Sequence, residues 1–90
     1  MRTYGACGGS SGVSHYEIGP SYIHLRFRHD PRIFVYSEKR PGLAKVLVMQ
    51  HLAIEGEGLT EFVHEQVPGD YETWFIPPRV RERAWNLLLP

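Results

Sequence analysis

Histidines and acidic residues are the side chains of this chain that could bind a metal ion or transfer a proton. His51 and Glu55 are four positions apart, and Glu61 and His64 are three apart, so each pair would share one face of a helix. A zinc site of the metalloprotease type needs the spacing HExxH, and structural zinc sites commonly use CxxC pairs; the chain contains neither. We therefore predict no metal site and no bound cofactor, and surface positions for these residues.

Nucleophilic catalysis would need an activated cysteine or serine. Cys7, the single cysteine, lies in the glycine-rich segment MRTYGACGGSSGVS, where nothing would hold its thiol beside an activating base. No GxSxG motif marks a serine nucleophile, and the glycines do not follow the phosphate-binding pattern GxxxxGK[ST]. The sequence predicts a protein that is not an enzyme and has no catalytic residue.

A basic and aromatic strand face is the strongest candidate for ligand binding. The stretch SYIHLRFR alternates between apolar side chains and polar or basic ones. The candidate ligand face consists of Tyr22, His24, Arg26 and Arg28, with Phe34 and Tyr36 from the next strand. Such a face could stack on the bases of single-stranded nucleic acid or hold an anionic group, and it could equally be a solvated sheet surface.

The charge balance makes nucleic acid the less favoured partner. Ten Lys and Arg are matched by ten Asp and Glu, which gives a formal net charge of zero. The charges are segregated, because residues 24–45 are mostly basic and residues 55–72 carry acidic side chains without any Lys or Arg. This segregation is typical either of solvated faces or of a basic face that docks on an acidic face of a second subunit.

Two strands would position the candidate ligand face. The alternation predicts a strand at 22–28 with Ile23, Leu25 and Phe27 toward the core, and RIFVYS predicts the return strand at 32–37. Asp30 and Pro31 form the turn between them. A further short strand is predicted at 15–18. The hairpin should therefore belong to a small antiparallel sheet.

Helices are predicted to cover that sheet. One should run over residues 42–55 and end in the glycines of GEG, and a second should run over 60–67 with Thr60 as its N-cap. Residues 70–78 read as an extended aromatic segment, and 78–88 as a C-terminal helix. The expected organisation is a flexible arm at 1–14, one α+β domain at 15–76, and a tail at 77–90 that packs on the domain or on a partner subunit.

The first predicted helix has apolar side chains on almost every side. At about 100° per residue, one arc should face the sheet. It contains Leu43, Val46, Leu47, Gln50, Ala53 and Ile54. Val48, Met49 and Leu52 lie outside this arc, and exposing such a side chain costs roughly 1.5–3 kcal/mol. They require a second cover, which is either the tail of the same chain or a second copy of the protein.

This second cover suggests a function. We predict a non-enzymatic protein-interaction module that forms a homodimer, and weak binding of nucleic acid or an anionic ligand by the hairpin face as the alternative. The candidate oligomer surface consists of Val48, Met49, Leu52, Trp74, Phe75, Trp85 and Leu88.

Three further features concern the compartment. A single cysteine excludes a disulfide within the chain, which suggests a reducing environment. No signal-peptide pattern is present, and no apolar run approaches the roughly 20 residues of a membrane span. We predict a cytoplasmic protein that does not interact with membranes.

The order of these segments resembles a known family. The string from YEIG through YIHLRFR and IFVYS to PGLAKVLVMQHLAIEGEGLTEFV is similar in layout to the KTSC domain of small bacterial proteins, which is also found appended to some lysyl-tRNA synthetases. The matching positions are Gly42, Ala44, Met49, Leu52, Ala53, Gly56, Gly58, Leu59, Phe62 and Val63. The resemblance implies a hairpin packed on a helix. A basic stretch follows this motif in the family, whereas TEFVHEQVPGDYE is acidic here, so a nucleic-acid role is not implied.

Overall fold

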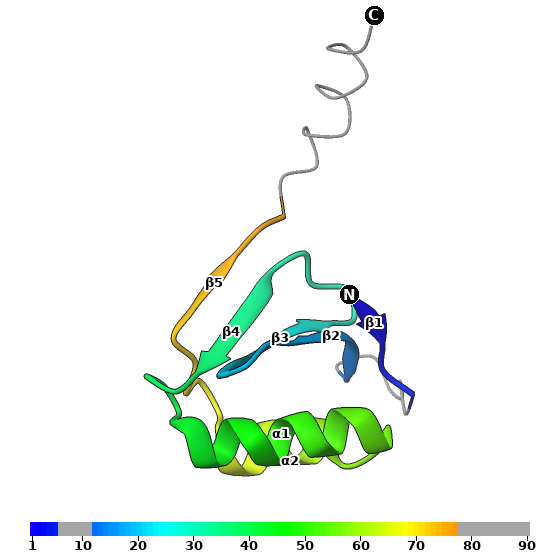
Figure 1. Cartoon of the computed structure of the whole chain (residues 1–90). Coiled ribbons are helices and arrows are strands. Elements are labelled where there is room, and N and C mark those ends of the chain that lie inside the picture. Colours follow the sequence, from blue (N-terminus) through cyan, green and yellow to red (C-terminus); the bar gives the residue numbers. More distant parts are fainter. Residues whose placement is uncertain (6–11, 78–90) are drawn as a thin grey trace, which may run out of the picture.

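The computed structural model describes residues 1–5 and 12–77, which form a sheet covered on one face by two helices (Figure 1). The elements in chain order are β1 (Arg2–Thr3), β2 (Val13–Ile18), β3 (Tyr22–Phe27), β4 (Ile33–Ser37), α1 (Leu43–Glu55), α2 (Leu59–Gln66) and β5 (Thr73–Phe75). The five strands are antiparallel and lie in the order β1-β2-β3-β4-β5. The predicted α+β fold is confirmed.

The central strands β2, β3 and β4 have one buried face and one open face. Ile23 and Leu25 point toward the helices and are fully buried. Their partners on β4 are Tyr36 and Phe34, which therefore share this inner face. The prediction that these two aromatic residues lie beside His24 on the outer face was wrong, because antiparallel partners always occupy the same side of a sheet.

The N-terminal segment is part of the domain, contrary to the predicted free arm. β1 pairs with β2, and the ring of Tyr4 lies between the sheet and the helices with 1% of its surface exposed. The Leu59 N–H donates a 2.9 Å hydrogen bond to the Tyr4 hydroxyl. Val13, also placed in the arm, begins β2 and is fully buried. The prediction relied on the glycine-rich composition of this segment. It did not take into account that the ring of Tyr4 could be buried in the core while its hydroxyl accepts a hydrogen bond from Leu59.

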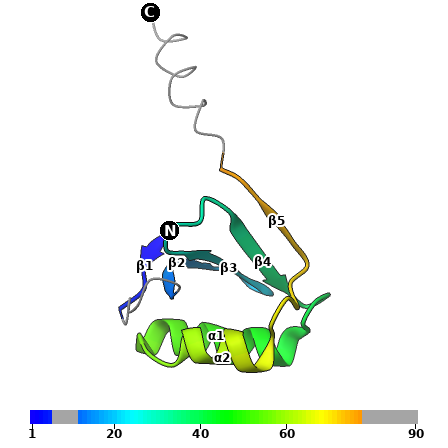
Figure 2. The same ribbon diagram turned by 180° about the vertical axis from the view of Figure 1, so that it is seen from behind.

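The covered side of helix α1 matches the predicted sheet-facing arc only in part, at Val46 and Ala53. Its buried residues are Val46, Met49 and Ala53, whereas Leu47 and Ile54 of the predicted sheet-facing arc are 50% and 68% exposed. The reason is α2, which lies side by side with α1 against the same face of the sheet (Figure 2). The covered side of α1 therefore lies between the sheet and α2. A helical wheel shows the side chains of one helix only, so it cannot show where a second helix packs.

Helix α2 begins one residue before its prediction. Gly58, in the left-handed conformation with φ of 86°, precedes its first residue. Thr60 lies inside the helix, and its hydroxyl accepts a hydrogen bond from the Val13 N–H at 3.1 Å. Leu59 and Val63 are buried in the core. The helix thus fastens the start of β2 as well as covering the sheet.

After α2 the chain returns to the sheet edge. The ring of Tyr71 packs edge-on against Phe34 at 4.9 Å and Tyr36 at 6.1 Å between ring centroids. β5 follows and pairs with β4. The C-terminal helix predicted at 78–88, with Trp85 and Leu88, lies outside the described residues. Within the part that is described, no helix is both long and apolar enough to cross a membrane.

Candidate interaction surface

β5 forms one edge of the described sheet, and its side chains are apolar and exposed. Trp74, Phe75 and the following Ile76 are 43%, 40% and 54% exposed. In the two opposite views, no strand or helix among the coloured segments lies along the free side of β5 (Figures 1 and 2). An apolar strand edge of this kind is a template for pairing with another chain.

The hydrogen bonds of β4 establish which backbone groups point toward β5. The N–H of Glu38, just after β4, donates to Ser21 next to β3 at 3.1 Å, and the Val35 carbonyl accepts from Glu72 next to β5 at 2.8 Å. Backbone groups of successive residues in a strand point to opposite sides. Even-numbered residues of β4 therefore bond to β3, and odd-numbered residues bond to β5.

This alternation determines the free groups of β5. Glu72 lies before β5, so the alternation within the strand starts at Thr73. Thr73 and Phe75 are the partners of the odd-numbered β4 residues Val35 and Ile33, so their backbone groups point inward to β4. The N–H and C=O groups of Trp74, and of Ile76 if the strand is continued, point away from the sheet. The open edge thus offers donors and acceptors at alternate residues, as strand addition requires.

The side chains of β5 are held on both faces of the sheet. On the inner face, the Arg32 guanidinium lies 5.0 Å from the ring centre of Phe34 and 5.2 Å from that of Trp74. A 2.9 Å ion pair with Asp30 holds Arg32 in place and, through its hydrogen bonds, keeps the pKa of the Asp30 carboxyl below its ordinary value. On the outer face, Phe75 packs edge-on against His24 at 5.8 Å.

Polar contacts fix the segment that leads into β5. The Ser37 hydroxyl donates a hydrogen bond to the Glu72 carboxylate, and Arg40 forms a 2.7 Å ion pair with Asp70. The ion pair is largely exposed and contributes little stability by itself. Together, these contacts place the start of β5 beside the loop that enters α1.

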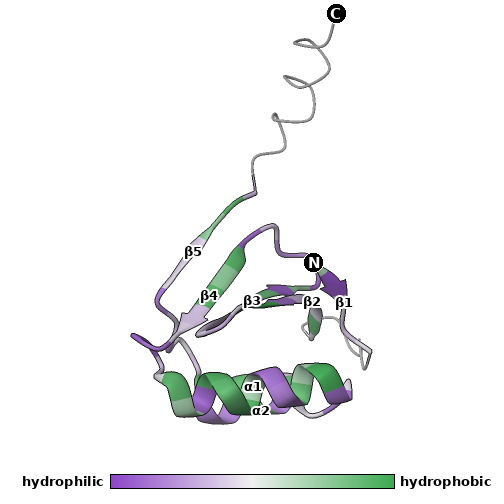
Figure 3. Ribbon diagram, in the orientation of Figure 1, coloured by the Kyte–Doolittle hydropathy of each residue, from purple (hydrophilic) through white to green (hydrophobic). Residues whose placement is uncertain are grey.

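A second apolar surface lies along α1. Leu43, Leu47 and Ile54 are 44%, 50% and 68% exposed, and their spacing places them on one side of the helix; we call these residues the α1 stripe. Gln50, next to the stripe, donates hydrogen bonds to the carbonyls of Gly19 and Tyr22 at 2.8 and 2.9 Å. The stripe therefore lies on the side of α1 nearest the β2–β3 turn. Hydrophobic bands run along α1 in Figure 3.

The predicted oligomer surface is only partly brought together. Trp74 and Phe75 are exposed on β5, and Val48 is exposed on α1. Met49 is fully buried in the core, so the prediction that it lies on a surface was wrong. Leu52 is partly buried and packs against the core cluster. Among the described residues, the exposed large apolar residues that the prediction missed are Met1, Ile18, Leu43, Leu47, Ile54 and Ile76. Their apolar character was visible in the sequence, but the position of α2 was not.

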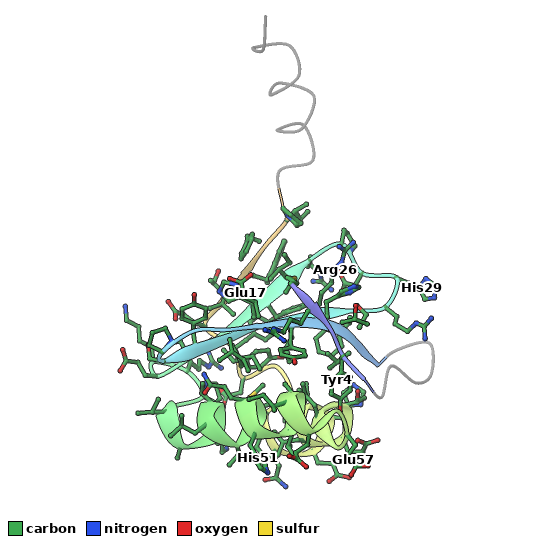
Figure 4. The ribbon with its side chains drawn as sticks, turned by 45° about the vertical axis from the view of Figure 1, so that its right-hand side comes forward. Tyr4, Glu17, Arg26, His29, His51 and Glu57 are labelled. Carbon is green, nitrogen blue, oxygen red and sulfur yellow. The ribbon has the colours of Figure 1, made fainter. Side chains whose placement is uncertain are left out.

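The predicted ligand face keeps three of its members. Tyr22 stacks on His24 with ring centroids 4.7 Å apart, and Arg26 is exposed on the same open face (Figure 4). Arg28 lies in the turn after β3, and Tyr36 is in the core with 2% exposure.

Two electrostatic features make this face less suited to anions than its arginines suggest. Glu17 is the cross-strand partner of His24, and it lies on the open side of the sheet in Figure 4. Burial lowers the pKa of His24 from 6.5, an effect that Glu17 opposes only in part. The imidazole is therefore neutral at pH 7, and Arg26 is accompanied by a carboxylate rather than by a second positive charge.

Among residues 1–5 and 12–77, no three or more His, Cys, Asp or Glu side chains gather closely enough to hold a metal ion. His51 points away from the sheet on the far side of α1, and Glu57 extends from the end of the helices (Figure 4).

Comparison with known proteins gives no relative: no family model, curated protein or solved structure matches the chain. The similarity to the KTSC domain therefore stays a prediction.

Proposed function

We propose that this domain is a non-enzymatic interaction module that associates with a second copy of itself through the free edge of β5. The observation that carries the proposal is the strand edge, where outward backbone groups coincide with exposed apolar side chains at Trp74, Phe75 and Ile76. Either feature alone is common on protein surfaces, but their combination is the pattern that natural sheets otherwise protect.

A two-fold axis at Phe75 would suit this edge. Antiparallel pairing would then set Trp74 opposite the partner's Ile76, and these residues would exchange hydrogen bonds through their outward N–H and C=O groups. Phe75 would face the partner's Phe75 across the axis, where a ring pair contributes about 0.5–1.5 kcal/mol beyond its area. The same residues of both copies would take part, as a closed dimer requires.

Anion or nucleic-acid binding at the hairpin face has weaker support. The structure leaves Tyr22, His24 and Arg26 on that face with Glu17 among them. Retention of a single-stranded oligonucleotide at low salt that is lost in Arg26→Glu would favour this alternative.

The oligomeric state tests the proposal. Light scattering across the micromolar range should give a mass of twice the 10.4 kDa of one chain. Trp74→Pro removes an outward N–H and should give a folded monomer, because proline is tolerated where a strand edge faces solvent. Trp74→Val, which keeps the N–H, is the matched control for loss of the ring and should weaken association less. A wild-type monomer at every concentration would refute the proposal.

A further inference from the structure

We infer that the C-terminal segment of one copy, residues 79–89, docks on the α1 stripe of its partner copy. The inference rests on the proposed pairing of β5 and names what covers the second apolar surface. It concerns a different face of the domain, so the two proposals can fail separately.

The α1 stripe needs an occupant that is long, narrow and apolar. Leu43, Leu47 and Ile54 follow one side of a helix of 13 residues. At the Ile54 end, the stripe opens into a groove of about 730 Å³. The groove is lined by Met1, Arg2, Tyr16, Glu17, Ile18 and Ile54. A folded domain could contact the stripe and the groove only with the few side chains at one of its edges. A single chain segment could contact them along their whole length.

The segment RVRERAWNLLL at residues 79–89 has this composition. It ends in Trp85 and the leucines 87–89, which are the side chains best able to fill an apolar stripe and groove. Arg79, Arg81 and Arg83 precede them. The segment is therefore basic where it leaves β5 and apolar farther along.

The direction of the proposed strand pairing leads this segment to the partner. In an antiparallel pair about Phe75, the chain beyond Ile76 runs past the partner's Glu72 and Asp70 toward the start of the partner's α1. That end of α1 is close, because Asp70 pairs with Arg40 at 2.7 Å and Lys45 donates to the Gln66 carbonyl at 3.4 Å. The basic residues 79, 81 and 83 would thus pass acidic side chains before the apolar residues reach the stripe.

Chain length permits this route. Residues 80–89 span up to about 33 Å when extended, and a helix of the length of α1 spans about 20 Å. Within its own chain, the segment leaves the sheet at the end of β4 that is far from α1. Phe75 pairs with Ile33, the first residue of β4, whereas α1 follows the last residue of that strand. The route to the partner's stripe is direct, and the route back to its own stripe is not.

The size of the interface also requires a second contact. Stable protein interfaces bury about 1,200–2,000 Å² in total, which a strand of three residues does not supply by itself. Two exchanged segments, one from each copy, would add area symmetrically on both sides of the axis.

Disulfide trapping between different chains tests the inference. In a Cys7→Ser background, Leu47→Cys and Leu88→Cys chains are mixed and oxidised. A covalent heterodimer on a non-reducing gel is expected, and adding Trp74→Pro should abolish it. Lys45→Cys, which lies on another side of α1, replaces Leu47→Cys as the matched control and should not trap. If the dimer persists but no cross-link forms, or if a chain carrying both cysteines closes within itself, the docking is refuted while the β5 pairing stands.

A second measurement does not depend on cysteine chemistry. Leu47→Asp should weaken dimerisation at least about tenfold, because it places a charge on a stripe that the segment would bury. Val48→Asp is equally polar but lies on another side of the helix, and it should leave the dimer constant unchanged. Equal effects of the two substitutions would overturn the docking. If wild-type protein proves monomeric, both proposals fail.

Discussion

The Tyr4 hydroxyl connects segments that are 55 positions apart in the chain, because it accepts a hydrogen bond from the Leu59 N–H at the start of α2. Burial raises the pKa of Tyr4, which the hydrogen bond from Leu59 only partly opposes, so the side chain stays a neutral phenol. One buried residue thereby fixes β1 against the helices. Single polar contacts of this kind have large effects because a buried N–H without a partner is costly.

Removing this hydroxyl should destabilise the domain. Tyr4→Phe leaves the ring in place but the Leu59 N–H unpaired, at a cost of about 1–3 kcal/mol. In thermal unfolding, each kcal/mol lowers the Tm of a domain this size by about 4–8 °C. Tyr22→Phe removes the hydroxyl of a half-buried tyrosine on the open face and should change the Tm much less. Equal shifts in the two variants would contradict the role assigned to Tyr4.

The pKa of His24 predicts a pH dependence of stability. Burial depresses the pKa of this imidazole in the folded state below its ordinary 6.5. The unfolded chain therefore binds the proton more readily, and the free energy of unfolding falls as the pH drops below about 6.5. His24→Asn should reduce this loss between about pH 7.5 and pH 5.5. His29→Asn, at an exposed turn position, is the control and should keep the wild-type slope.

Among the elements, α1 shows how a second helix selects the buried side of the first. Val46, Met49 and Ala53 are covered, while the α1 stripe and Val48 remain exposed, although all are apolar. Because α2 occupies one flank, the core needs only part of the apolar surface of α1. Of this remaining surface, the proposed docking would use the α1 stripe and not Val48.

Truncating one buried and one exposed apolar residue of α1 should change the free energy of unfolding by different amounts. Met49→Ala opens a cavity in the core and should lower the free energy of unfolding by about 2–5 kcal/mol. Val48→Ala, at a position that is 44% exposed, should change it by less than about 0.5 kcal/mol. Urea unfolding monitored by circular dichroism measures both. A larger loss at Val48 than at Met49 would contradict the placement of Met49 in the core and of Val48 on the surface.

The whole molecule, taken as a single copy, exposes two apolar surfaces. A monomer would leave the edge of β5 and the α1 stripe facing water on two sides of a small domain. Association that buries them would also stabilise the fold, since any partner that binds only the folded state shifts the unfolding equilibrium.

Thermal stability should therefore depend on protein concentration. The Tm of the wild-type chain should rise between low and high micromolar concentration, and the Tm of Trp74→Pro should not. Differential scanning calorimetry at several concentrations provides the measurement. A concentration-independent Tm in both proteins would argue against a dimer linked to folding.

The sequence by itself determined the local elements of this protein. Alternation in YIHLRF and IFVYS located the hairpin within one or two residues, and Gly42 and Gly56 limited α1, because side-chain periodicity and glycine conformation act over a few neighbouring positions. Exposed Trp74 and Phe75 were also anticipated as a contact surface, although their role there remains a proposal.

Only the tertiary structure decided which apolar residues are used where. The burial of Tyr4, Tyr36 and Met49 and the exposure of Leu47 and Ile54 depend on where α2 and β1 pack, which are contacts between distant parts of the chain. Periodicity assigns residues to faces but does not say which face another element will cover. A domain of this size has one small core, which cannot cover every apolar face of its elements. The edge of β5 and the α1 stripe are the apolar surfaces that remain exposed among the described residues.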